Sequence, residues 1–490
     1  MPEVVPLHHP IYRMSNQEVK EYNESIETGS IDRLIPFIKD EDLKERFKDS
    51  TVVKLYDAYV SKKLSPVATI NKVLQSIEEL NPIYKPFSAK PLIAEILKQA
   101  ADSEDRYLDG KPLSIFDGVP VAFKDMINIK GYVMSDGSSC KTKVAESDDL
   151  IVKRFRDLGA IILPPTTMTE GGVTPIGYSV YPKGPFNPYN KNHYSGGSSG
   201  GSAVAVALGI CPVAIGYDGG GSVRTPAALS GVYGIATGYG RIPFSSHLSS
   251  TMIKSGVFGE SIADTLLGYA VMARDVDLEN DFFSKMYDGG VGGFPKAHLT
   301  ALLKSKDSDS DLSDLTIGVK NFKIPNIKWA RLSHALKISN EFASANLEPN
   351  TRITVGVGSM LTAVEILSAE KIRAYTMDWI RKVFKDGGID VIFTPTVPLT
   401  APKVTPGSLE TGESNTPLTV ELCKYIFLGN FLGLPGIANP IGFDEGNDGM
   451  PISALVTGFQ WDEDKVFRVS AAIEKLGGER KRPSDAVALI

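Results

Sequence analysis

The feature that most constrains the fold is a pair of glycine- and serine-rich clusters joined by a short apolar segment. The clusters span Ser195–Ser202 and Gly216–Pro226, and residues 203–215 between them are mostly apolar. A glycine- and serine-rich run on its own is typical of a flexible linker. Here the apolar segment has to be buried, so both clusters are held at its ends, and their glycines fall where backbone must come close to another group.

The rest of the chain alternates between helical and strand patterns. Residues 49–81 predict two helices, the second with Ser65 as N-cap and Pro66 in its first turn. Further helices are predicted at 92–107, 150–158 and 361–384, and buried strands at 118–125, 160–163, 315–319 and 390–395. This alternation predicts an α/β fold with a mixed, largely parallel central sheet covered by helices.

We expect one large domain rather than several. The chain has 490 residues, without an internal repeat or a long linker. The predicted organisation is an N-terminal arm over residues 1–48, the main domain over 49–478 and a short tail over 479–490.

Composition excludes several classes of function. The net charge of −6 comes from interspersed charges, which disfavours a nucleic-acid partner. Three widely spaced cysteines without a Cys-x-x-Cys motif indicate neither disulfides nor a zinc site, and they fit a reducing compartment. The N-terminus lacks a signal-peptide pattern, and the longest nearly apolar stretch, 203–216, is too short to span a membrane.

No cofactor or metal is indicated by the motifs. The chain has no nucleotide-binding fingerprint in the required strand–turn–helix context. The run Asp307–Asp311 begins like a calcium loop, but Leu312 and Gly318 stand where that loop needs glycine and glutamate. We interpret it as a solvated loop.

The second cluster contains three consecutive glycines that end in a serine, Asp218-Gly-Gly-Gly-Ser222. Without side chains, these glycines leave backbone N–H groups free to point into a cavity as an oxyanion hole. A serine beside such donors has the position that an acyl-transfer nucleophile needs. We therefore predict Ser222 as a nucleophile.

A serine nucleophile needs a base. The six histidines are better explained as surface or packing residues, although His193, next to the first cluster, stays an alternative. Lys124 is the other candidate, because it ends an apolar strand and burial lowers the pKa of a lysine. It could act near neutral pH after a pKa decrease of roughly 3 units from about 10.4, which corresponds to roughly 4 kcal/mol. Otherwise its ammonium group reaches solvent or pairs with Asp125.

Three segments together resemble the signatures of the amidase signature family: Gly118–Asp125, Gly196–Ser202 and Asp218–Pro226. The spacing is also similar, since Ser198 follows Lys124 by 74 residues and precedes Ser222 by 24. The resemblance extends from about Ser65 to Leu476. The sequence departs from the family pattern at residues 163–168 and 234–238. These segments are expected near the pocket and outside the triad, so the departures concern which substrate is bound more than the reaction.

The resemblance implies an α/β/α sandwich and a Ser-cisSer-Lys triad. Ser222 would attack an amide carbonyl, and Ser198, on a cis peptide after Gly197, would pass the proton to neutral Lys124 and later protonate the leaving amine. Water would then hydrolyse the acyl-enzyme. The implied oxyanion donors are the N–H groups of Gly219, Gly220, Gly221 and Ser222, and the implied supporting interactions are an Asp218–Arg224 ion pair and a hydrogen bond from Ser199 within the triad.

Within the family, the chain looks most like fatty acid amide hydrolases of the plant type, on the basis of residues 9–13, 390–402, 408–415 and 425–433. The expected substrates are then fatty acid amides such as N-acylethanolamines. We expect a location in the cytoplasm or at the periphery of an intracellular membrane, and a homodimer stays open.

Three alternatives remain. One is the glutamine-hydrolysing subunit of a tRNA-dependent amidotransferase, and another is an inactive binding protein on the same fold. The third is an esterase whose nucleophile elbow is Gly196–Gly200, but the preceding residues 187–194 are polar instead of an apolar strand.

Overall fold

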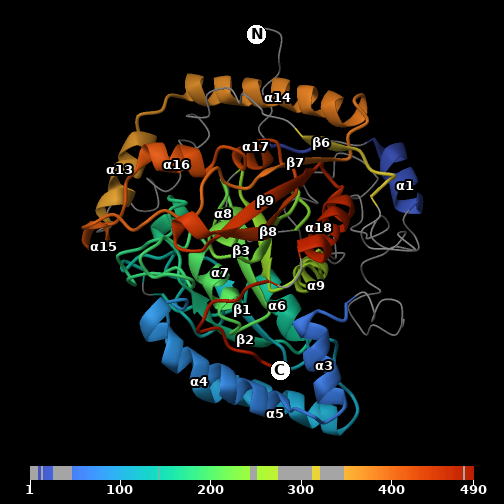
Figure 1. The fold of residues 1–490 in the computed structure, drawn as a ribbon, viewed down its shortest axis with the longest axis vertical. Helices are drawn as coiled ribbons and strands as arrows, with labels where there is room; N and C mark the ends of the chain where they lie inside the picture. Colours follow the sequence, from blue (N-terminus) through green and yellow to red (C-terminus); the bar gives the residue numbers. More distant parts are fainter. Residues whose placement is uncertain are drawn as a thin grey trace.

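The centre of the protein is a nine-stranded sheet with the order β2-β1-β3-β5-β4-β8-β9-β7-β6 (Figure 1). The computed structural model describes residues 9–12, 15–25, 47–141, 143–242, 251–273, 312–319, 347–477 and 480–490. The strands are β1 Pro120–Lys124, β2 Ile161–Thr166, β3 Val213–Asp218, β4 Tyr233–Ala236, β5 Lys254–Gly259, β6 Ile317–Val319, β7 Val391–Pro395, β8 Gly436–Asp444 and β9 Met450–Gly458.

Helices cover this sheet, which confirms the predicted α/β class with a mixed sheet. In Figure 1, α4 and α5 lie along the lower edge of the molecule and α14 along the upper edge. The helices are α1 Asn16–Ser25, α3 Thr51–Val60, α4 Pro66–Tyr84, α5 Ile93–Leu108, α6 Leu150–Asp157, α7 Gly200–Ala207, α8 Arg224–Leu229, α9 Ile262–Met272, α13 Pro349–Gly358, α14 Ala363–Lys385, α15 Ser408–Thr411, α16 Thr416–Leu422, α17 Phe427–Phe431 and α18 Glu463–Gly477. Short 3-10 turns occupy Glu170–Gly172 and Glu445–Asn447.

The expectation of a largely parallel sheet is wrong. Parallel pairing occurs within β2-β1-β3 and between β6 and β7. The pairs β3–β5, β5–β4, β4–β8, β8–β9 and β9–β7 are antiparallel. Strands β8 and β9 follow one another through a short loop, and such a connection is too short for the crossover that a parallel pair needs.

Helix signals in the sequence agree with the observed ends. The Ser65 hydroxyl accepts a hydrogen bond from the N–H of Ala68 and begins α4, as expected of an N-cap. Thr362 and Glu365 form a capping box at the start of α14. The apolar segment between the two clusters forms most of the buried helix α7, a turn and the first half of β3.

The parallel end of the sheet is buried along its whole length. All residues of β1 are buried, and β1 lies between β2 and β3. Phe123 packs edge-on against Phe155 of α6, with ring centroids 5.6 Å apart. A polar side chain at the end of β1 is therefore shielded from solvent on both sides.

The described termini pack onto this body. Tyr22 of α1 donates a hydrogen bond to the carbonyl of Trp461 at 2.8 Å, and Val487 donates its N–H to the carbonyl of Leu208 at 2.8 Å. Among the described helices, no single one has both the length and the apolar composition to cross a membrane, and only α13 and α14, bent by 86°, pass that test as a pair.

Candidate active site

Lys124 ends β1 in the protein interior. It is 1% exposed, and its Nζ donates a hydrogen bond to Ser198 Oγ at 2.6 Å. Burial lowers the pKa of Lys124 to about 7, while the carboxylates of Asp136 and Asp218 act in the opposite direction. A lysine with this pKa is neutral in a large fraction of molecules near pH 7 and can accept a proton. The carboxylate of Asp125 accepts hydrogen bonds from Ser135.

Ser198 precedes α7 in a tightly packed backbone turn. The Gly197–Ser198 peptide bond is cis. A Cβ atom on Gly197 would lie 2.8 Å from the Cα of Gly177, and one on Gly196 would lie 2.7 Å from the Cα of Pro226. Side chains at both positions are therefore excluded, which gives the first cluster a steric reason for its glycines.

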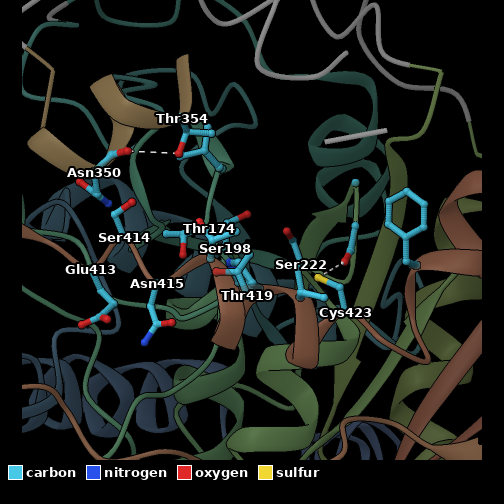
Figure 2. Close-up of a pocket in the computed structure, with 18 of the residues that line it drawn as sticks. Thr174, Ser198, Ser222, Asn350, Thr354, Glu413, Ser414, Asn415, Thr419 and Cys423 are labelled. Carbon is cyan, nitrogen blue, oxygen red and sulfur yellow. Dashed lines mark hydrogen bonds between the residues drawn. The ribbon is translucent and has the colours of Figure 1, made fainter. Parts of the chain in front are cut away.

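Ser222 lies in the loop between β3 and α8, beside the first cluster. Its carbonyl accepts a hydrogen bond from the N–H of Ser199 at 3.2 Å, which joins the two clusters. Ser222 is 9% exposed, and it lines the same cavity as Lys124 and Ser198 (Figure 2). The described structure has no hydrogen bond between the Ser222 and Ser198 hydroxyls; such catalytic bonds commonly tighten when substrate is bound.

Asp218 and Arg224 form a buried ion pair that sets the shape of this loop. Arg224 Nη2 lies 2.9 Å from Asp218 Oδ1, and both side chains are fully buried. Asp218 also accepts hydrogen bonds from the N–H groups of Gly221 and Val223, at 2.8 and 3.1 Å. Burial alone would raise the pKa of Asp218, but the Arg224 guanidinium outweighs it, with help from Lys254, and the pKa lies well below its usual value.

The N–H groups of the glycine loop are not all free. The N–H of Gly221 donates to Asp218, so this group stabilises the loop itself and differs from our expectation of an oxyanion donor. In the described part of the chain, the N–H groups of Gly219, Gly220 and Ser222 make no hydrogen bond. Gly219, Gly220 and Ser222 also line the cavity. These three groups are the available donors for an oxyanion.

Two other residues differ from their expected surroundings. The Ser199 hydroxyl donates to the carbonyl of Tyr217 at 3.2 Å instead of to a triad residue, because α7 directs it toward β3. The ring of His193 is buried away from the cavity lining, with its nitrogens 2.6 Å from the Ala401 carbonyl and 2.9 Å from Asp448 Oδ2. His193 therefore has a structural position, and Lys124 is the basic residue beside Ser198.

The cavity has a volume of about 350 Å³, and its wall has a polar part and an apolar part. Figure 2 shows Thr174, Asn350 and Ser414 on the Ser198 side, and Cys423 beside Ser222. Much of the wall comes from α13, α16 and α17, which lie far from the clusters in the sequence. Its apolar residues include Met252, Ile253, Ile353, Val357, Val420 and Phe427.

Sequence reasoning missed a group of residues that hold the glycine loop from outside. Asn430 and Cys423, in and before α17, make hydrogen bonds to Asp218 and to the Gly220 carbonyl. Lys254, on β5, is 1% exposed and donates to the carbonyls of Gly429 and Leu434. These residues lie beyond both clusters and carry no local motif, so only the fold brings them to the loop.

Comparison with known proteins finds relatives that match most of the chain. The sequence model of the Amidase family matches residues 68–308 and 315–467. The chain is 34% identical over 467 residues to a fatty acid amide hydrolase of Medicago truncatula, covering 87% of this chain and 76% of that protein. It is 28% identical to a glutamyl-tRNA(Gln) amidotransferase subunit of Halothermothrix orenii, covering 89% of this chain and 99% of that protein.

Solved structures of amidases share the fold of this chain. A bacterial aryl acylamidase of the amidase signature family superposes with a TM-score of 0.72 at 21% identity, covering 87% of this chain and 96% of that one. The family match spans most of the chain and includes both glycine clusters. The chain therefore belongs to the amidase signature family of amide-hydrolysing enzymes.

Proposed function

We propose that this protein is a serine amidase that hydrolyses carboxylic amides through Ser222, Ser198 and Lys124, with fatty acid amides, including N-acylethanolamines, as its substrates. The observation that carries the catalytic part is the 2.6 Å hydrogen bond between Lys124 Nζ and Ser198 Oγ, in a cavity that Ser222 also lines. A lysine with a pKa of about 7 supplies the base that this cavity needs.

In the proposed reaction, Ser222 Oγ forms a bond to the carbonyl carbon of the substrate. Its proton moves to Ser198 Oγ as Ser198 gives its own proton to Lys124 Nζ. The N–H groups of Gly219, Gly220 and Ser222 stabilise the negative charge that develops on the carbonyl oxygen. The C–N bond then breaks as Ser198 gives a proton to the leaving nitrogen and takes one back from Lys124, which becomes neutral again. A water molecule attacks the ester by the same proton route and releases Ser222.

The cavity wall supports a substrate with a long apolar acyl group. Met252, Ile253 and Phe427 are buried apolar residues that line it. At its outer end, Ile353 of α13 and Val420 of α16 also line it, although they are 55% and 53% exposed. Apolar surface thus continues from the cavity to the outside, where an acyl chain could extend.

Exposed apolar residues that follow α13 support peripheral contact with a membrane. Met360 and Val364, between and at the start of the two helices α13 and α14, are 79% and 72% exposed. Exposed apolar side chains grouped in this way commonly mark an interaction site. We propose that this surface inserts into the interface of a lipid bilayer and delivers lipid amides to the cavity.

The glutamine-hydrolysing amidotransferase remains the second candidate, because its relatives match nearly the whole chain at 28% identity. The fatty acid amide hydrolases match at higher identity, up to 34% in Medicago truncatula. We therefore favour the fatty acid amide reaction.

Labelling with a fluorophosphonate, which reacts with activated serines, tests the catalytic proposal. We expect one labelled peptide containing Ser222 in the folded protein and no label in Ser222→Ala. Ser61→Ala, at an exposed helix end remote from the cavity, serves as the matched control and should label like the original protein. Absence of label from Ser222 in folded protein would favour the inactive binding protein.

Hydrolysis of amides that differ in the acyl group alone tests the substrate proposal. With one amine and acyl chains of increasing length, kcat/KM should rise with length as more apolar surface is buried. A rate that does not change with chain length would refute the lipid substrate. Hydrolysis of glutamine faster than of any acyl amide would favour the amidotransferase alternative.

A further inference from the structure

We infer that Asn430, on α17, is a positioning residue that orients the N–H of Gly219 toward the oxyanion of the substrate. The inference rests on the proposed function, because it assigns Gly219 as an oxyanion donor. Asn430 lies 212 residues after Asp218 in the sequence and is fully buried against the glycine loop.

The side-chain amide of Asn430 is bonded on both its nitrogen and its oxygen. Its Nδ2 donates to the backbone carbonyl of Asp218 at 2.7 Å and to Asp218 Oδ1 at 2.8 Å, and lies 3.2 Å from the carbonyl of Met252. Its Oδ1 accepts a hydrogen bond from Arg224 Nη2 at 2.6 Å. Since a guanidinium only donates, the oxygen of the amide must face Arg224 and the nitrogen must face Asp218.

The bond to the Asp218 carbonyl determines where the next N–H points. In a trans peptide, the C=O of one residue and the N–H of the next point in opposite directions within one plane. The carbonyl of Asp218 points toward Asn430, so the N–H of Gly219 points away from Asn430. Gly219 lines the cavity, and its N–H has no hydrogen bond in the described residues. Asn430 therefore helps to hold the plane of the first peptide in the loop, at the end of the β3–β5 pairing.

Other contacts hold the remaining planes of the loop. The carbonyl of Gly220 accepts a hydrogen bond from Cys423 Sγ at 3.2 Å, and the carbonyl of Gly221 accepts one from the N–H of Thr225 at 2.7 Å. Gly219 has no side chain to restrict its peptide by packing. The plane between Asp218 and Gly219 is therefore held by backbone pairing of Asp218 with Lys254 of β5 and by the hydrogen bond from Asn430.

Asn430 is itself held firmly enough to act in this way. Lys254 Nζ donates to the carbonyl of Gly429 at 3.2 Å and to that of Leu434 at 2.6 Å, on the two sides of Asn430 in the sequence. Arg224 Nη1 donates to the carbonyl of Ile426 at 3.0 Å. The short helix α17 is thus bonded to β5 and to the glycine loop together.

Two substitutions separate the donor from the bulk of the side chain. Asn430→Asp keeps the size but replaces the donor by an oxygen next to Asp218, and Asn430→Ser keeps a donor on a shorter side chain. Asn439→Ala is the matched control, because Asn439 is equally buried and donates to the carbonyl of Ile437 at 2.9 Å, outside the cavity lining. Thermal unfolding of each variant verifies that it is folded.

The readout compares binding of the tetrahedral state with binding of the intact amide. We expect Asn430→Asp to lower kcat by about 10- to 100-fold. Removing a complete oxyanion donor lowers kcat by about 100- to 1,000-fold, so a misdirected donor should cost less. The inhibition constant of a trifluoromethyl ketone, whose adduct with serine carries an oxyanion, should rise by the same factor as kcat/KM falls. Affinity for the intact amide, measured in a Ser222→Ala background, should stay unchanged.

The outcomes distinguish this inference from the proposed function. Wild-type protein without amide hydrolysis would overturn both. An active wild-type enzyme whose folded Asn430 variants keep kcat would overturn the inference alone. A fall in kcat without a matching rise in the inhibition constant would also overturn it, because the loss would then not come from the oxyanion site. The Asn439→Ala control should keep both constants.

Discussion

Replacing Lys124 with methionine tests whether the fold bears an energetic cost for holding this lysine neutral in the interior. Lys124 is 1% exposed and its pKa is lowered to about 7 by burial. In the unfolded chain, the pKa of a lysine is about 10.4. Methionine has a similar length, no charge and no titration, so it fills the site without this cost.

The size and sign of the effect follow from the two pKa values. A difference of about 3 pKa units corresponds to about 4 to 5 kcal/mol, which is the full cost at and below pH 7. Between pH 7 and pH 10.4 the unfolded state binds one proton more than the folded state, so the free energy of unfolding of the original protein rises with pH, by up to about 1.4 kcal/mol per pH unit. The methionine variant lacks this dependence.

Urea unfolding of both proteins at pH 7 and pH 9 measures the effect. The difference in their free energies of unfolding should change by about 2 kcal/mol between the two pH values, in favour of the original protein at pH 9. Lys63→Met, at an exposed lysine, is the control and should show a much smaller change. A pH-independent difference for Lys124→Met would refute the argument that the buried lysine is neutral.

The same lysine predicts how activity depends on pH. If its neutral form accepts the proton from Ser198, kcat/KM should fall about tenfold for each pH unit below about pH 7, as Lys124 becomes protonated. The methionine variant should lose hydrolysis at every pH. A kcat/KM that stays constant from pH 5 to pH 8 would contradict Lys124 as the base.

Three further predictions concern the loop, the turn and the outer surface. Arg224→Met removes the partner of buried Asp218 and should lower the free energy of unfolding by about 3 to 5 kcal/mol. Denaturant unfolding measures this, and an unchanged midpoint would count against a stabilising ion pair. Gly197→Ala places a methyl group 2.8 Å from the backbone of Gly177 and should lower the free energy of unfolding by about 1 to 3 kcal/mol. It should also displace Ser198, so normal amide hydrolysis by this variant would contradict the steric argument. Val364→Asp should weaken co-sedimentation with phospholipid vesicles but leave hydrolysis of a soluble short-chain amide unchanged, and undiminished vesicle binding would exclude this surface from membrane contact.

The elements that could be predicted from the sequence are those with a local signal. Strand β1 is marked by its apolar run, and α4 by the Ser65 and Pro66 pattern at its start. The glycine loop at Ser222 could be predicted because the apolar segment before it has to be buried, which holds the glycines and the serine in place. The order and direction of β4, β5 and β8 depend on pairing between distant segments, and so the antiparallel majority of the sheet was not predicted.

The site divides in the same way. Lys124, Ser198 and Ser222 lie in recognisable motifs, but the burial that lowers the pKa of Lys124 depends on β2 and β3 packed beside β1. Helix α13, which gives Ile353 and Val357 to the cavity, has no prediction at all, because apolar residues on it face outward as well as inward. Asn430 lies in residues 425–433, which resemble the plant-type enzymes, but that resemblance assigns it no role, and its position depends on a contact across the fold.

The hydrogen bonds from Asn430 and Cys423 to the glycine loop have a consequence for biosynthesis. All residues of the predicted triad have left the ribosome well before α17 is made, since Ser222 precedes Asn430 by some 200 residues. A nascent chain therefore holds nucleophile, relay and base long before the support of its oxyanion loop exists. A chain cut or terminated before α16 would keep every triad residue and yet lack both contacts that orient the loop peptides.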